Sequence, residues 1–340
     1  PGQTIPYLVE NPERIPAARY YDDAFFKLEC ERVWPHVWQM ACRLEQIPNV
    51  GDWVEYSNVG KSVIIVRTKD GIKAHHNHCR HRGVPIAGGK GNEHGNCAKA
   101  GFVCPFHGWR WDMEGECTFV YGKHLFSEDL VEKQELALIP CRVETWGGCA
   151  FINLDDDAPS LRECLGPVLQ RLEAHGVDDL RAEWWCGTVL PANWKTAMEA
   201  FQEGYHVMKT HPQLPEAMGA MYNGLYGPGH AGAGSGVMQD VDFKGVSSKQ
   251  VVEAQIRHME RLSEGMAGMC QQKEVDIAKS LRDVDLPEDP ARAMQAWWGM
   301  VQDKVSKELK SRGENVPDLN AVCASDPVHA VEFLFPHHFL

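Results

Sequence analysis

Two short stretches decide the fold: Cys79-Arg80-His81-Arg82-Gly83 and Cys104-Pro105-Phe106-His107-Gly108. Each stretch offers one thiolate and one imidazole, at the spacings Cys-x-His and Cys-x-x-His. Four such donors, Cys79, His81, Cys104 and His107, make a metal cage. Because each stretch contributes one ligand of each kind, we expect two hairpin loops that hold the metal from opposite sides. The glycine that ends each stretch allows a tight turn.

Three interpretations of this donor set are open from the residues alone. Two cysteines and two histidines are an accepted ligand set for structural zinc. Chance is the second, because the chain has 16 histidines and several crowd this region. The third is a [2Fe–2S] cluster with two cysteines on one iron and two histidines on the other. Cys97 and Cys117 have no partner at ligand spacing, so we expect neither to be a ligand.

The residues around the four donors resemble the two cluster loops of Rieske domains. The resemblance covers residues 77–83 and 104–112, including the Trp-Arg-Trp-Asp that follows Gly108. It favours the [2Fe–2S] cluster over zinc and over chance. Two neutral imidazoles in place of thiolates remove negative charge, which raises the reduction potential of such a cluster.

A second pair of histidines, His206 and His211, lies in the segment 193–212. Residues five apart are about 140° apart around a regular helix, so the helix must end or bulge if both bind one metal. Thr210 and Pro212 favour an ending, because proline disfavours the helical conformation of its predecessor. Two imidazoles with a carboxylate form the facial triad of mononuclear Fe(II) oxygenases. On its own, a pair of histidines at this spacing is weak evidence for an iron site. The alternative is that both are ordinary exposed histidines of a helix.

The segment resembles the iron-binding region of Rieske oxygenases, so nearly the whole chain is similar to the alpha (terminal oxygenase) subunits of the aromatic-ring-hydroxylating dioxygenase family. The resemblance implies that His206 and His211 hold Fe(II). It also implies that Glu203, three residues before His206, is the electron-transfer bridge between the two metal centres. The usual residue there is aspartate, so Glu203 departs from the pattern. The third, carboxylate ligand is expected beyond residue 340.

The chemistry that the resemblance implies is oxidation by O2. Electrons from NAD(P)H arrive indirectly, through a ferredoxin and/or a flavin reductase. His107 or His81 then passes an electron through Glu203 to the Fe(II) site, where O2 is the co-substrate. We expect hydroxylation or dihydroxylation of a small apolar substrate, aromatic or polycyclic. The alternatives are monooxygenation or demethylation of a non-aromatic substrate, and a Rieske electron carrier without oxygenase activity.

The resemblance also implies a homotrimer, possibly with a beta subunit. Pocket residues are expected next to the iron ligands, where soft and adaptable side chains suit an apolar substrate. The predicted substrate-binding residues are Phe201, Gln202, Met208 and Leu214.

Charge and hydropathy exclude other classes. The chain has 34 basic and 47 acidic residues, a net charge of −13, which repels phosphate backbones and excludes nucleic acid as a partner. No apolar run reaches the roughly 18 residues of a membrane span, and the N-terminus lacks a signal-peptide pattern. We therefore expect no membrane partner and a cytoplasmic location.

The predicted fold class is α+β. We expect an N-terminal helical segment at residues 1–40 that packs on the catalytic domain, an all-β Rieske domain at 41–157, and a larger α+β catalytic domain at 158–340. The catalytic domain should be an antiparallel sheet flanked by helices, incomplete at its C-terminus. The predicted helices are 22–33, 161–175, 193–208, 250–261 and 289–310. The predicted strands are 51–57, 61–68, 147–153, 183–190 and 331–340, with loops at 88–101 and 224–236.

Overall fold

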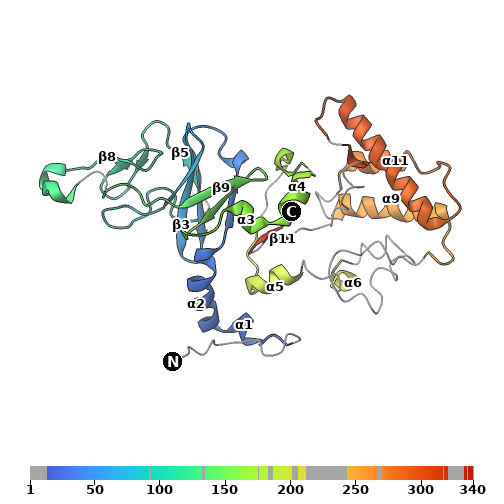
Figure 1. The fold of residues 1–340 in the computed structure, drawn as a ribbon, viewed down its shortest axis with the longest axis horizontal. Coiled ribbons are helices and arrows are strands. Elements are labelled where there is room, and N and C mark those ends of the chain that lie inside the picture. Colours follow the sequence, from blue (N-terminus) through green and yellow to red (C-terminus); the bar gives the residue numbers. More distant parts are fainter. Residues whose placement is uncertain are drawn as a thin grey trace. The chain divides into compact units, whose positions relative to one another are not determined.

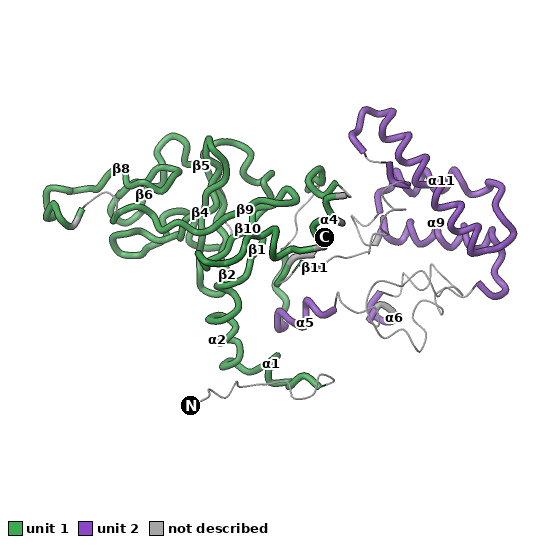
Figure 2. The backbone as a smooth tube through the Cα atoms, viewed as in Figure 1, with its two compact units in different colours: residues 1–191, 332–340 green, residues 192–331 purple. Residues whose placement is uncertain are grey.

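The computed structural model describes residues 14–91, 93–131, 135–174, 176–182, 187–200, 206–211, 243–265, 270–316, 318–320, 333–334 and 336–339. The chain forms two compact units, one of Pro1–Pro191 with Glu332–Leu340 and one of Ala192–Val331 (Figure 2). Sheets in the first unit and helices in the second confirm the α+β class. Within the described residues, no helix is long and apolar enough to cross a membrane.

The first unit begins with short helices and continues as a set of small antiparallel sheets (Figure 1). The sheet orders are β1-β10-β9, β4-β3-β2-β5 and β6-β7-β8. The helices are α1 (Ala18–Tyr21), α2 (Asp23–Arg32), η1 (Trp34–His36), η2 (Leu44–Gln46), η3 (Lys123–Leu125) and η4 (Glu128–Leu130). The strands are β1 (Gln39–Arg43), β2 (Asp52–Asn58), β3 (Lys61–Arg67), β4 (Ile72–His76), β5 (His94–Asn96), β6 (Phe102–Val103), β7 (Arg110–Trp111), β8 (Cys117–Phe119), β9 (Arg142–Trp146) and β10 (Cys149–Asn153).

Strand β3 is buried on both faces. The side chains on its two faces pack into two different cores. Val63 and Ile65 pack with Ala150 and Ile152 of β10, between the two larger sheets. The intervening residues of β3 point the other way, because successive side chains of a strand alternate. Ile64 therefore packs into a second core that contains both cysteines of the metal motif. Strand β3 thus lies between the core shared with β10 and the core that contains Cys79 and Cys104.

Two helices, α3 (Leu161–Leu165) and α4 (Pro167–Ala174), cover the outer face of the β1-β10-β9 sheet. They separate at Gly166, whose φ is +54°, and the turn η5 (Val177–Asp179) follows. Their leucines pack with Trp38 and Phe151 in one core. Because of this packing the first unit extends to Pro191, beyond the boundary expected at 157.

The chain returns to the first unit at its end. Strands β11 (Phe333–Leu334) and β12 (His338–Phe339) pair antiparallel, so the single strand predicted for 331–340 is instead a hairpin in its described residues. Leu334 is 4% exposed and joins the core under α3 and α4. The His337 ring contacts Trp34, with 5.9 Å between centroids. The N-terminal residues from 14 onwards also belong to this unit.

The second unit is helical in its described residues. Its helices are α5 (Trp194–Glu199), α6 (Val207–Thr210), α9 (Ser248–Gly265), α10 (Gln272–Lys279) and α11 (Pro290–Ser311). Helix α11 begins where Asp289 accepts a hydrogen bond from the Arg292 N–H at 2.8 Å, and Pro290 supplies the first helical residue. Trp297 is fully buried where α9, α10 and α11 meet.

Most of the predicted elements are confirmed in the described residues, and besides the hairpin at 333–339 two of them need correction. The predicted loop at 88–101 contains strand β5, which pairs with β2. Residues 187–190 of the predicted strand 183–190 have no regular structure and are exposed, and its first four residues lie outside the described part of the chain. The predicted helix 193–208 appears as α5 and the start of α6, with residues 201–205 outside the described part. The loop predicted at 224–236 also lies outside the described part.

Candidate metal centres

The first ligand loop is closed by two backbone hydrogen bonds. The Cys79 N–H donates to the Val84 carbonyl, and the Gly83 N–H donates to the Cys79 carbonyl, both at 2.8 Å. Gly83 has a φ of +75°, which glycine adopts without strain. An added Cβ would meet nothing within 4 Å, so backbone conformation and not space favours glycine here.

The second ligand loop repeats this closure. The Cys104 N–H donates to the Trp109 carbonyl at 2.8 Å, and the Gly108 N–H donates to the Cys104 carbonyl at 3.0 Å. Gly108 has a φ of +70°. The two loops therefore have the same backbone design, with a cysteine at the start and a left-handed glycine four residues later. This confirms the expectation of two similar turns.

Like donors of the two loops lie together. Cys79 and Cys104 are 3% and 2% exposed, and burial together with the neighbouring Cys104 thiol raises the pKa of the Cys79 thiol. The Nδ1 atoms of His81 and His107 lie 3.1 Å apart. The arrangement pairs cysteine with cysteine and histidine with histidine. A [2Fe–2S] cluster held by two cysteines on one iron and two histidines on the other needs this pairing.

The donor chemistry fits the same cluster and disfavours zinc. A structural zinc ion needs four donors that converge on one point. In the described part of the chain, no three His, Cys, Asp or Glu side chains converge in this way. In the cluster each iron takes only two protein ligands. Burial and the neighbouring His107 lower the pKa of His81, which keeps its ring in the neutral form that binds metals.

Aromatic rings enclose His81 more closely than His107. Trp109, 4% exposed, stacks on the His81 ring with 5.0 Å between centroids and 12° between planes. Phe126 meets both rings edge-on. His107 is covered by Phe106, 4.1 Å away between centroids, and that phenylalanine is 53% exposed. The ring that covers His107 is therefore itself exposed to solvent, whereas the ring stacked on His81 is buried.

The second histidine pair stands at the two ends of α6. His206 comes directly before the helix and His211 directly after it. The Thr210 N–H donates to the His206 carbonyl at 2.8 Å, and the helix ends there, as Thr210 and Pro212 predict. The two imidazole rings then lie 5.4 Å apart between centroids, at 72°. Both rings are half-buried, so the pair suits one shared metal ion.

Several predicted site residues cannot be placed. Glu203, Phe201, Gln202 and Leu214 lie outside the described residues. Met208 lies in α6 between the two histidines, and its side chain is outside the described part. Their roles stay predictions.

Residues that support the first site gave little signal in the sequence. Trp109 and Phe126 sit against His81, although only Trp109 belongs to the quoted motif. Glu55 and Asn77 are buried and hold the chain beside the first ligand loop. Glu55 has one detectable signal: it is a charged residue on an inward-facing position of β2, which shares a face with Trp53.

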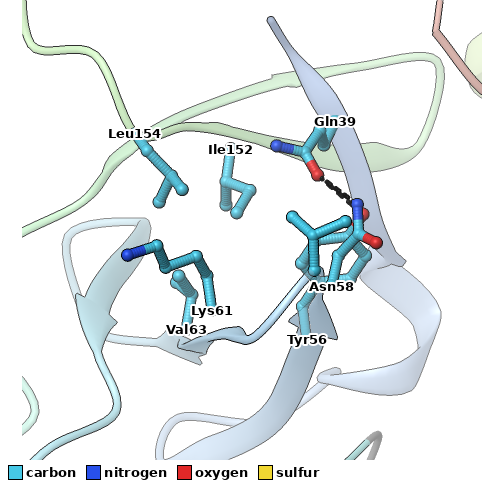
Figure 3. A pocket seen from close by; sticks show the side chains of 8 residues that line it. Gln39, Tyr56, Asn58, Lys61, Val63, Ile152 and Leu154 are labelled. Atoms are coloured by element: carbon cyan, nitrogen blue, oxygen red, sulfur yellow. Dashed lines mark hydrogen bonds between the residues drawn. The ribbon is translucent and has the colours of Figure 1, made fainter. Parts of the chain in front are cut away.

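A separate hollow in the first unit is not a substrate site. It is lined by Gln39, Tyr56, Asn58, Val59, Lys61, Val63, Ile152 and Leu154. Figure 3 shows the Asn58 amide donating to the Gln39 oxygen at its rim. Its interior has room for about one water molecule. None of the metal donors lines it.

Comparisons with known proteins agree with this geometry. The sequence matches the Rieske [2Fe-2S] domain over residues 37–123 and the catalytic domain of the ring hydroxylating alpha subunit over residues 169–280. The chain belongs to the Rieske oxygenase alpha subunits. The family implies a [2Fe–2S] cluster and a mononuclear iron that uses O2, and it contains monooxygenases and dioxygenases.

Relatives of two kinds share about half their length with this Rieske alpha subunit. The carnitine monooxygenase oxygenase subunit of Escherichia coli K12 is 30% identical over 214 residues, 61% of this chain and 55% of the relative. The biphenyl 2,3-dioxygenase subunit alpha of Rhodococcus jostii RHA1 is 34% identical over 211 residues, 59% of this chain and 44% of the relative. The chain therefore spans about half the length of the curated relatives that it matches.

Solved structures of the same two kinds resemble this alpha subunit. A quaternary ammonium Rieske monooxygenase bound to L-carnitine gives a TM-score of 0.53 at 26% identity, over 59% of this chain and 56% of the other. Naphthalene 1,2-dioxygenase with bound indole gives 0.54 at 26% identity, over 81% of this chain and 61% of the other.

Proposed function

We propose that this chain is the terminal oxygenase component of a Rieske monooxygenase that acts on a small quaternary ammonium compound. The main structural support for oxygenase activity is the His206–His211 pair at the ends of α6. A Rieske electron carrier needs no second metal site, whereas an oxygenase needs one with open positions for O2. The pair therefore favours the oxygenase over the carrier.

The substrate class comes from relatives. Subunits of carnitine monooxygenase and of glycine betaine monooxygenase match this chain over about 60% of its length. These matches favour monooxygenation of a non-aromatic substrate, which the sequence alone left as an alternative. They disfavour the aromatic substrate that was the main expectation. Aromatic faces attract quaternary ammonium groups, so Phe201, five residues before His206, is our leading candidate for such a contact.

In the proposed reaction, one atom of O2 enters a C–H bond of the substrate and the other leaves as water. NAD(P)H supplies two electrons, with one additional proton, through a ferredoxin and/or a flavin reductase. The bound mononuclear iron supplies the O2 activation. This chain's Cys79, Cys104, His81 and His107 hold the cluster that receives the electrons, and Glu203 is proposed to join the two centres. A homotrimer in the cytoplasm, possibly with a beta subunit, completes the proposal.

Iron content tests the two-site part of the proposal. The purified full-length protein should hold about three irons, and its His206→Ala or His211→Ala variant about two, from the ligand counts of the two sites. Both variants should keep the cluster's visible absorption and lose O2-dependent turnover. His258→Ala is the matched control, because this histidine lies in α9 and belongs to neither pair. Two irons in the wild type, or turnover at a tenth of wild type in the variants, would exclude the oxygenase assignment.

Aromatic dioxygenation is the second candidate, because biphenyl dioxygenase is 34% identical. Turnover with 18O2 separates the two functions. Carnitine, γ-butyrobetaine and glycine betaine should be consumed, and the carbonyl product should carry one labelled oxygen if it is reduced at once with borohydride, because an aldehyde exchanges its oxygen with water. Biphenyl and naphthalene should not be consumed. A product of biphenyl or naphthalene with two labelled oxygens, and no reaction with the amines, would replace our proposal by the second candidate.

A further inference from the structure

A buried carboxylate lies behind the first ligand loop. Glu55 of β2 is 2% exposed and stands directly opposite Ile64 of β3. Opposite residues of an antiparallel pair share a face, so Glu55 points to the side of the core that contains Ile64 and both cluster cysteines. Within the described part of the chain no Lys, Arg or His forms an ion pair with it.

The partners of this carboxylate are hydrogen-bond donors from three parts of the chain: β3, the residues after β4, and the glycine-rich segment 88–91. Its Oε2 accepts from the backbone N–H groups of Gly89 and Gly91, each at 3.0 Å. Its Oε1 accepts from the Ser62 hydroxyl at 2.7 Å and from the Asn77 amide at 3.3 Å. All four donors are neutral. The buried negative charge is therefore solvated but not neutralised.

The backbone of residues 88–91 curves around the Glu55 carboxylate, and glycines allow this conformation. Gly88, Gly89 and Gly91 have φ angles of +64°, +111° and +87°, a region that glycine adopts without strain. A Cβ on Gly88 would come within 2.5 Å of the Glu55 Oε2. Successive backbone N–H groups in such a turn form an anion-binding concavity. Here the bound anion is the chain's own carboxylate.

Asn77 connects this anchor to the ligand loop. Its Oδ1 accepts from the N–H groups of Ile86 at 2.9 Å and Ala87 at 3.1 Å, and its Nδ2 donates to the Ala87 carbonyl at 2.6 Å. Asn77 precedes Cys79 by two residues, and the loop closes at Val84. The chain is therefore held just before and just after the loop that carries Cys79 and His81.

The carboxylate is ionised in this setting. Burial raises the pKa of the Glu55 carboxyl, but the hydrogen bonds from Gly89, Ser62, Gly91 and Asn77 outweigh it and hold the pKa below its ordinary value. A fixed negative charge repels an added electron, and the repulsion is stronger in a protein interior than in water. The charge should therefore disfavour reduction of a cluster bound nearby.

We propose that Glu55 is a positioning residue for the [2Fe–2S] cluster. Through Asn77 and residues 86–91 it fixes the loop of Cys79 and His81, and its charge favours the oxidised cluster. The proposal concerns the Rieske centre alone, so it does not depend on the substrate or on the second iron.

Spectroelectrochemistry of the full-length holoprotein tests the charge. Glu55→Gln should keep the cluster and shift its one-electron reduction equilibrium about tenfold towards the reduced form, a rise of 59 mV. Ser62→Ala is the matched control, because it removes a bond to the same carboxylate and keeps the charge. Its equilibrium should move less than about twofold, because the charge near the cluster stays the same. An unchanged equilibrium in Glu55→Gln, or an equal shift in Ser62→Ala, would overturn the charge role.

Glu55→Asp tests the positioning separately and remains informative if Glu55→Gln does not fold. It keeps the charge, so the reduction equilibrium should stay within about twofold of wild type. The shorter side chain cannot reach the glycine amides and Asn77 together, so an iron chelator should bleach the cluster about tenfold faster, as expected for about 1.4 kcal/mol lost. Bleaching at the wild-type rate would show that the carboxylate does not position the loop.

Discussion

Replacing Trp109 with alanine should weaken both the core and the hold on His81. The indole is 4% exposed and packs in the core that includes Cys79 and Cys104. Truncation of a buried tryptophan to alanine costs about 3–5 kcal/mol. A domain of this size has about 5–15 kcal/mol of stability, so we expect the variant to fold but with a clearly lower midpoint of urea unfolding.

The stacking on His81 gives the prediction its functional part. An aromatic pair contributes about 0.5–1.5 kcal/mol beyond the area it buries, and about 1.4 kcal/mol is a factor of ten in an equilibrium constant. If His81 must swing away before the cluster is lost, Trp109→Ala should accelerate chelator-driven bleaching about tenfold. Trp109→Phe is the matched control, because it keeps a ring against His81, and it should bleach within about threefold of wild type.

The assay is the visible absorbance of the oxidised cluster with an excess of chelator, at a urea concentration where every variant is folded by far-UV circular dichroism. Bleaching of Trp109→Ala at the wild-type rate would refute the idea that the stack retains His81. Equal acceleration in Trp109→Phe would assign the effect to lost volume and not to the ring.

Two further predictions concern the metal centres. Cys79→Ser should abolish the visible cluster spectrum while the strands of the first unit remain folded. The wild-type potential should lie within roughly −150 to +300 mV, and absorption and EPR signals retained in the variant would exclude Cys79 as a ligand. Glu203→Gln should keep both metals but slow cluster reoxidation on mixing with substrate and O2 by about 10–100-fold, because an amide has one uncharged acceptor atom where a carboxylate has two charged ones. Reoxidation at the wild-type rate would move the bridging role to Glu199.

Features encoded over a few neighbouring residues could be predicted. The β2–β3 hairpin follows from the predicted strands 51–57 and 61–68 with only Asn58-Val59-Gly60 between them, where Val59 and Gly60 have φ angles of +42° and +75°. The four candidate cluster ligands could be proposed from the sequence because each loop is a local turn with its donors at fixed spacing. The end of α6 between His206 and His211 was also local, since it depends on Thr210 and Pro212.

Features that depend on distant partners could not be predicted. Strand β5 lies in a glycine-rich stretch that reads as a loop, and it exists only because it pairs with β2, about forty residues earlier in the chain. The role of Glu55 depends on donors at positions 62, 77, 89 and 91, and no local pattern links these positions. The first unit extends beyond residue 157 because α3 and α4 find their apolar partners on a sheet that was complete before them.

The return of residues 332–340 to the first unit affects how this protein can be made and divided. Leu334 completes a core with Trp38, and His337 lies against Trp34, yet the 140 residues of the second unit must be synthesised between them. Closing a loop of that length costs about 4 kcal/mol of chain entropy in the ideal-chain estimate. During translation the apolar surface around Trp38 therefore stays exposed until residues 332–340 have been synthesised. A recombinant Rieske fragment that stops at Pro191 would retain that exposed surface and should aggregate, unless residues 332–340 are supplied as a separate peptide or spliced on by a short linker.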